Sequence, residues 1–137
     1  MTKTTIEEML RMQFKRARKK GYADNFEFEE RCDTYESLRS DERCVVKVKA
    51  RDNTSFHITN QGIIHQGESS RNILDYNQLK EVYWMSEDFE GRKKLLKKYH
   101  DRIIMKTNDK KRKVIDNLGG SYRPLYASLY WYCNLKN

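Results

Sequence analysis

The chain has 137 residues, 37% of them hydrophobic, 12% aromatic and 35% charged, and its 28 Lys and Arg against 20 Asp and Glu give a net charge of +8. This length fits one domain, and the aromatic content excludes a disordered chain. The charged share exceeds the roughly 25% of average proteins, so a modest core lies under a charged surface. The positive balance favours acidic partners such as nucleic acid, anionic lipid or an acidic protein surface.

The N-terminus and the cysteines indicate a cytoplasmic protein. MTKTTIEEML has no apolar run typical of a secretory signal, and no stretch approaches the roughly 18 apolar residues that span a bilayer. Cys32, Cys44 and Cys133 form no C-x-x-C pair, and the histidines complete no zinc-ligand spacing. We expect buried or reduced thiols, no metal, no cofactor and no transmembrane segment.

The first predicted element is an amphipathic helix over residues 4–20. Thr4 and Glu7 have the spacing of a capping box, and Gly21 provides a stop. One face carries the apolar positions, which are Ile6, Met9, Leu10, Phe14 and Ala17. We expect this face to pack on its own domain. The alternative is an arm whose basic C-terminal half docks to a membrane or a partner.

A second helix is predicted from Asp24 to Ser40, because the apolar positions Phe28, Cys32, Tyr35 and Leu38 have helical spacing. Phe26 and Phe28 alternate like a strand, but we prefer the helix. The two helices make residues 1–41 a helical extension, followed by a β-domain over residues 42–137. If the extension packs on the sheet, Phe14, Phe28 and Tyr35 are buried.

After Asp41 the apolar period changes from about 3.6 to about 2 residues, which predicts strands. Six of the seven predicted strands are joined by short connections, as in an antiparallel meander. The seven segments are VVKVKAR, SFHIT, IIHQ, RNILDY, LKEVYWM, RIIMKT and KRKVIDNL. A short helix is expected within Ser86–His100. The chain ends in an aromatic helix, Ser121–Asn134, whose apolar face needs a sheet to cover.

FHITNQGIIHQG, RNILDYNQLKEVYW and RIIMKTNDKKRKVI carry a family pattern. They resemble a T-x-x-G-I-I hairpin, an I-x-Y-x-x-I-x-x-V strand with Leu79 in the second isoleucine position, and a later hairpin of bacterial pleckstrin-homology-like (PH-like) domains. The likeness covers about residues 43–137. It implies an α+β fold, in which a seven-stranded antiparallel half-barrel is capped by the C-terminal helix. That fold usually serves as a binding platform.

Three basic groups are candidate binding sites. Lys47, Lys49 and Arg51 share a strand face, and in lipid-binding members of the family such residues hold headgroup phosphates. The loop that follows is short and contains Asp52, so a solvated strand face is the preferred interpretation. The second group lies in the inserted helix and the third at a hairpin tip: Arg92, Lys93, Lys94, Lys97 and Lys98, and then Lys110, Lys111, Arg112 and Lys113. Both groups are suited to an anionic membrane or to nucleic-acid phosphates, or they are solvated surface.

Catalysis has little support. Thr59, His57 and His65 could share one face of the hairpin, but no nucleophile elbow, phosphate-binding glycine loop or metal–carboxylate spacing accompanies them. We therefore predict a non-enzymatic binding module for a protein or peptide, which adds as a strand between an open sheet edge and the C-terminal helix. The alternative is an anionic surface, lipid or nucleic acid, bound through the basic groups.

Overall fold

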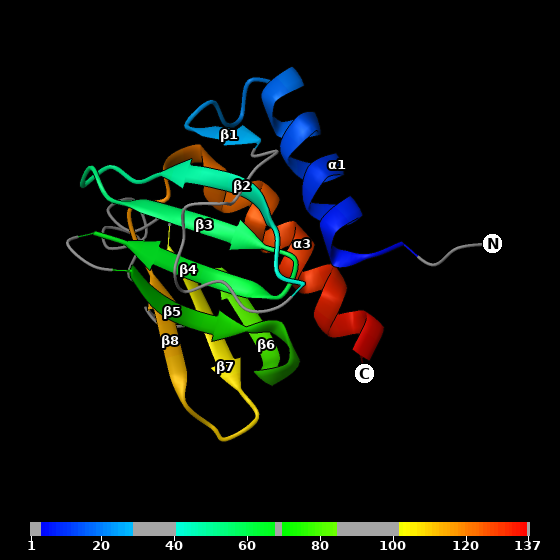
Figure 1. Ribbon diagram of the computed structural model, residues 1–137. Coiled ribbons are helices and arrows are strands. Elements are labelled where there is room, and N and C mark those ends of the chain that lie inside the picture. The colour runs from blue at the N-terminus through cyan, green and yellow to red at the C-terminus, as the bar shows by residue number, and fades with distance from the viewer. Residues whose placement is uncertain (1–3, 29–40, 68–69, 85–101, 137) are drawn as a thin grey trace, which may run out of the picture.

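The computed structural model describes residues 4–28, 41–67, 70–84 and 102–136, and its two sheets lie beside a pair of helices (Figure 1). In chain order the helices and strands are α1 (Ile6–Lys19), β1 (Phe26–Phe28), β2 (Cys44–Lys49), β3 (Ser55–Thr59), β4 (Gly62–Gln66), β5 (Ser70–Asp75), β6 (Leu79–Trp84), β7 (Ile103–Thr107), β8 (Arg112–Ile115) and α3 (Tyr122–Lys136). Two single 3-10 turns, Tyr76–Gln78 and Gly119–Ser121, precede β6 and α3.

The strands form a five-stranded sheet in the order β1-β2-β3-β4-β5 and a three-stranded sheet in the order β6-β7-β8. Every pairing is antiparallel. The seven predicted strands are present as β2 to β8, and β1 is an eighth. The α+β class is therefore confirmed. The inserted helix expected within residues 86–100 lies outside the described residues.

The alternation predicted for β2 is observed. Val46 and Val48 are buried, as is Ala50 just after the strand, whereas Lys47 is half-buried and Lys49 is exposed. The two-residue period of a strand places the valines toward the core and the lysines on the outer face.

The helix predicted from Asp24 is wrong at residues 26–28. These residues form β1, in which Phe26 lies opposite Val48 and Phe28 opposite Val46. Alternate residues share a face in a strand but not in a helix, so only the extended chain turns both phenyl rings toward the core side. Phe26 meets Phe14 edge to face at 4.8 Å, and Phe28 is half-buried. The rest of the predicted helix, with Tyr35, lies outside the described residues.

The first helix is confirmed, with its cap one residue later than predicted. Thr5 is the N-cap, and its hydroxyl accepts a hydrogen bond from the Glu8 backbone N–H at 3.2 Å. Glu7 therefore stays available for other contacts. At the other end Gly21 adopts φ +78°, and the Tyr22 N–H donates to the Ala17 carbonyl at 2.8 Å. These are features of a Schellman cap, which ends the helix where the glycine predicts.

Helix α1 packs on the domain, as expected. It lies against α3 and β2, and the two helices run antiparallel along one side of the sheets (Figure 1). One hydrophobic cluster joins buried side chains from α1, both sheets and α3, among them Leu10, Phe14, Val46, Met105 and Leu129. The described residues before residue 41 thus share one hydrophobic core with the predicted β-domain, and β1 pairs with β2 across this boundary.

Candidate binding surfaces

Two of the three basic residues predicted to share a strand face lie in one hollow. Lys47 and Lys49 line a depression of about 330 Å³ on the outer face of β1 and β2, with Asp24, Glu27, Asn53 and Ser55 on its other sides. Glu27 lies directly opposite Lys47 in the strand register. Two acidic groups thus balance the two lysines, which disfavours a dedicated phosphate site. Arg51 is exposed and does not line this hollow.

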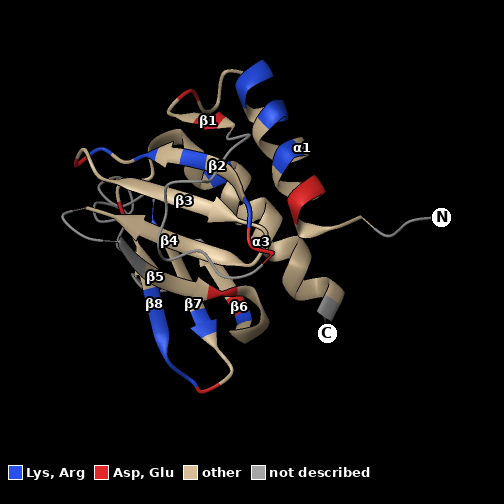
Figure 2. Cartoon of the chain, viewed as in Figure 1, with Lys and Arg blue, Asp and Glu red and all other residues tan. Residues whose placement is uncertain are grey.

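The third basic group, residues 110–113, lies at the turn between β7 and β8. Lys111 forms an ion pair with Asp109 at 3.8 Å, and the Lys113 Nζ donates to the Ile73 carbonyl of β5 at 2.5 Å. At least two of its four cations therefore already contact other groups of the protein. Figure 2 shows this turn and the basic residues of α1 at opposite ends of the molecule. Residues 92–98 lie outside the described residues.

A larger depression, of about 480 Å³, separates β8 from β3, β4 and β5. On its wall, Thr54 Oγ1 donates to Asp52 Oδ1 at 2.6 Å, and His65 Nε2 lies 2.8 Å from the same hydroxyl. Because the hydroxyl proton points to the carboxylate, His65 Nε2 is the donor in the second bond. Hydrogen bonds from the Thr54 side chain and backbone hold the pKa of Asp52 below its ordinary value, and the nearby His65 lowers it further.

The grouping of Thr59, His57 and His65 on one face is wrong. Directly opposed residues share a face, and the register places His65 opposite Phe56 and His57 opposite Ile64. His65 stacks on the Phe56 ring at 4.6 Å. His57 is fully buried on the other face, where its Nε2 lies 2.6 Å from the side-chain oxygen of Gln66. The sheet therefore separates the two histidines.

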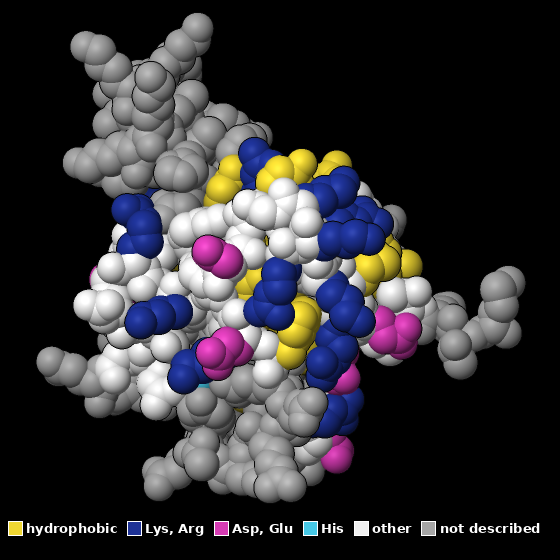
Figure 3. Space-filling view, turned by 90° about the horizontal axis from the view of Figure 1, so that it is seen from above, with side chains coloured by type: hydrophobic (Ala, Val, Ile, Leu, Met, Phe, Trp, Pro, Cys, Tyr) yellow, Lys and Arg dark blue, Asp and Glu magenta, His cyan; other side chains and the backbone are white. Residues whose placement is uncertain are grey.

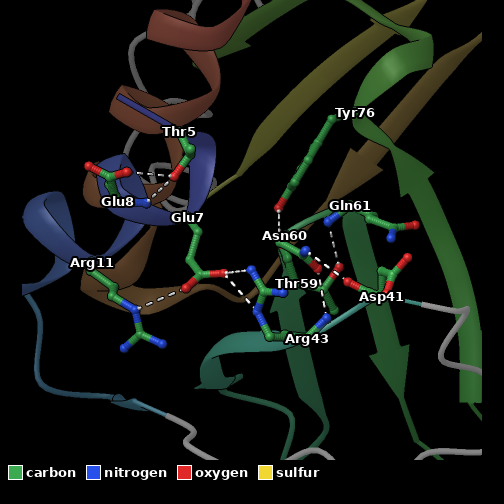
Figure 4. Close-up of polar contacts among 10 residues, drawn as sticks. All are labelled: Thr5, Glu7, Glu8, Arg11, Asp41, Arg43, Thr59, Asn60, Gln61 and Tyr76. Carbon is green, nitrogen blue, oxygen red and sulfur yellow. Dashed lines mark hydrogen bonds and ion pairs between the residues drawn. The ribbon is translucent and has the colours of Figure 1, made fainter. Parts of the chain in front are cut away.

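A polar corner that the sequence did not predict surrounds the N-terminus of α1 (Figure 4). Glu7 Oε1 accepts hydrogen bonds from Arg43 at 2.8 Å (Nη2) and 3.2 Å (Nε), which connects α1 to the start of β2. The Arg43 backbone N–H donates to Asn60 Oδ1 at 2.7 Å, which connects β2 to the β3–β4 turn. This outer layer of the corner is exposed to solvent.

A buried layer lies beneath it. The Tyr76 hydroxyl donates to the Thr59 carbonyl at 2.8 Å, and the Thr59 hydroxyl donates to Glu42 Oε2 at 2.6 Å. Burial raises the pKa of Tyr76 well above its ordinary value of 10, and the nearby Glu42 carboxylate raises it further. Beside this layer is a hollow of about 230 Å³, lined by Ile6, Asn60, Gln61, Asp75, Tyr76, Asn77 and Tyr132.

A cation contacts a main-chain carbonyl on each outer strand of the five-stranded sheet. Arg18 Nη2 donates to the Phe26 carbonyl of β1 at 2.8 Å, and its guanidinium lies 4.3 Å from the Phe26 ring. The preceding carbonyl, of Asn25, already accepts from Lys49 of β2 at 2.8 Å, so the Phe26 carbonyl points away from the sheet. Arg18 thereby blocks strand addition at β1. On β5, the acceptor is the Ile73 carbonyl and the donor is Lys113.

Comparison with protein families, curated proteins and solved structures found no match. Neither helix in the described ranges combines the length and apolarity needed to cross a bilayer. Within those same ranges, no three His, Cys, Asp or Glu side chains are grouped closely enough to hold a metal ion. Cys44 and Cys133 are buried and form no disulfide, and Cys32 lies outside the described residues.

Proposed function

We propose that the protein is a non-enzymatic binding module of PH-like architecture whose partner is an extended protein segment. The order of its elements supports this: four antiparallel strands, β2 to β5, are followed by three, β6 to β8, and then by α3. The resemblance in the sequence implies the same order. The added α1 and β1 join the edge of this arrangement and do not interrupt it.

The contrast between the sheet edges carries the proposal. The β1 edge is blocked by Arg18, and β5 is tied to β8 through Lys113. The remaining candidate is β6, which with β8 is one of the two outer strands of the three-stranded sheet and packs beside α3. A segment that adds there would gain main-chain hydrogen bonds from β6 and side-chain contacts from α3, the mode known as β-augmentation.

The test selects, from a displayed random library, the peptides that bind the full chain. Their contacts on the protein are then mapped by hydrogen exchange. We expect slower exchange at residues 79–84 and along α3. Lys80 is suited to an edge-blocking variant because it is exposed and falls in the register shift between Leu79 and Glu81. Proline is tolerated at such bulges but obstructs an incoming strand. Lys80→Pro should abolish peptide binding, whereas Lys80→Gln, which removes the same charge, should retain it.

Equal binding by both variants, or protection by the peptides at a site remote from β6, would overturn the proposal. The anionic alternative is weaker at Lys47 and Lys49, because Asp24 and Glu27 share their hollow. A different part of the surface, on the outer side of α1, has the charge that this alternative requires.

A further inference from the structure

The outer side of α1 carries four exposed cations, Lys15, Arg16, Lys19 and Lys20, which we call the basic face. Arg16, Lys19 and Lys20 follow Lys15 by one, four and five residues, and this spacing places all four on one side of the helix. Together with Met12 they line a shallow depression of about 520 Å³ that contains no acidic side chain. Figure 3 shows Lys and Arg gathered over this end of the molecule, with hydrophobic side chains between them.

No described residue neutralises these charges. The other two arginines of α1 are engaged, since Arg11 pairs with Glu7 at 3.7 Å and Arg18 donates to Phe26. The four cations of the basic face form no ion pair and no side-chain hydrogen bond within the described part of the chain. Like charges four residues apart, as in Lys15 and Lys19, destabilise a helix by about 0.2–0.5 kcal/mol per pair. Arg16 and Lys19 lie in the last turn, where the helix dipole favours cations and offsets this repulsion, so the charges fit the helix and remain available to an external anion.

The first turn of α3 extends this surface. Gly120 packs against the backbone of Tyr22, which brings the start of α3 to the end of α1. The Arg123 guanidinium lies 4.7 Å from the Tyr22 ring, and Tyr22 is 49% exposed. A fifth cation and a half-exposed aromatic ring thus lie next to the basic face.

The chemistry of this surface selects among anionic partners. A helix that binds a membrane inserts an apolar face, but the apolar face of α1 is buried in the core. Among the described residues 4–22, the exposed large hydrophobic side chains are Met12 and Tyr22. A nucleic-acid strand requires a track of cations and exposed rings or guanidinium planes on which bases stack. We propose that the basic face, with Arg123 and Tyr22, binds the sugar–phosphate backbone of a single-stranded nucleic acid.

The dimensions agree with a few phosphate contacts. Lys15 to Lys20 cover about 7.5 Å of helix axis, at about 1.5 Å per residue. One strand of a duplex carries a phosphate for about every 3.4 Å of axis, and an extended single strand is longer per phosphate. The span of the basic face therefore matches at most three consecutive phosphates, and Arg123 provides a fourth contact. The binding is independent of sequence and sensitive to salt.

The test measures the binding of a fluorescent mixed-sequence oligonucleotide of about 12 nucleotides to the full chain across a salt series. Each phosphate contact contributes about −0.7 to the slope of log K against log salt, so four contacts give about −2.8. Lys15→Gln with Lys19→Gln should reduce that slope by about 1.4 and weaken binding at about 0.1 M salt by about 25-fold. Tyr22→Leu should weaken binding without changing the slope.

The matched control is Lys80→Gln with Lys106→Gln. Both lysines are exposed, lie on β6 and β7, and belong to none of the predicted basic groups, and their loss changes the net charge by the same amount. An unchanged slope in this control supports the proposal, whereas equal weakening of both double variants shows a net-charge effect only and overturns it. Two further results would also overturn it: no oligonucleotide binding at low salt, or stronger binding to phosphatidylcholine vesicles that contain about 30% phosphatidylserine.

Discussion

The two ends of α1 are fastened to the domain in different ways. At its C-terminal end, close backbone packing and hydrogen bonds to main-chain carbonyls hold the chain. At its N-terminal end, an exposed ion pair, Glu7 with Arg43, lies over the buried layer that contains Tyr76. The charged contact is the more conspicuous in Figure 4, but buried and main-chain contacts contribute more because solvent does not screen or replace them.

Asn25 is the centre of the C-terminal attachment. Its Nδ2 donates to the carbonyls of Leu118 at 2.7 Å and Lys49 at 2.9 Å, and its Oδ1 accepts from the Ser121 hydroxyl at 2.7 Å. One side chain thus joins β1 to the end of β2 and to the turn that begins α3. The turn is further fixed by Gly120, which lies against the backbone of Tyr22.

Gly120→Ala should have the largest effect. A Cβ at this position would lie 2.0 Å from the Tyr22 carbonyl oxygen, so α1 and α3 would have to separate at their junction. We expect a loss of about 3 kcal/mol in the free energy of unfolding, measured by chemical denaturation. Gly21→Ala is the control, since φ is +78° there but nothing lies within 4 Å of the new Cβ. It should cost only about 1 kcal/mol, from backbone strain alone. A loss for Gly120→Ala no larger than this would contradict the steric clash with Tyr22.

Asn25→Ala should come next. It removes three hydrogen bonds and leaves the buried Ser121 hydroxyl without this acceptor, and the expected loss is about 2–3 kcal/mol. Ser121→Ala removes one of the three and should cost about 1 kcal/mol. In the double variant the two losses should not add, because they share a bond. Additive losses would mean that the Asn25–Ser121 bond contributes nothing.

These contacts also show how far the sequence predicted the fold. The period of the apolar residues predicted α1, the strands β2 to β8 and α3, because each is long enough to express a repeat. β1 has three residues, and one of its two phenylalanines, Phe28, also fits the helical spacing of the apolar positions that follow. Pairing with β2 decides in favour of the strand, and that pairing is a tertiary contact invisible to local periodicity.

The candidate sites were less predictable for a similar reason. Asn25 acts through partners 24, 93 and 96 residues away, two of which are backbone carbonyls that no side-chain pattern reveals. The basic character of the C-terminal half of α1 was evident, but whether an acid of the described residues neutralises it depends on the fold. At the other end of α1, the shift of the cap from Thr4 to Thr5 makes Glu7 available to Arg43.

Tyr76→Phe tests the buried layer at the other end of α1. The variant loses the hydrogen bond to the Thr59 carbonyl, at an expected cost of about 1–2 kcal/mol at neutral pH. The raised pKa of Tyr76 also makes a prediction about pH. A raised folded-state pKa contributes stability that is present below the unfolded value of about 10 and is lost as pH rises above it. The wild type should therefore lose stability above pH 10, and Tyr76→Phe should lose less. Parallel curves for the two proteins would contradict the burial of this phenol.

Glu7→Gln should have the smallest effect, although it removes the most visible contact of the corner. The side chain of Arg43 is 64% exposed, so solvent screens its attraction to Glu7. Exposed pairs of this kind contribute about 0.2–1 kcal/mol to the free energy of unfolding. The negative charge of Glu7 near the helix N-terminus adds about a few tenths of a kcal/mol. We expect a loss below about 1 kcal/mol that shrinks as salt is added. A double-mutant cycle with Arg43→Ala separates the pair from the effect of the helix dipole. A coupling above about 2 kcal/mol that resists salt would place this pair with the buried contacts, and the contrast between the two ends of α1 would then fail.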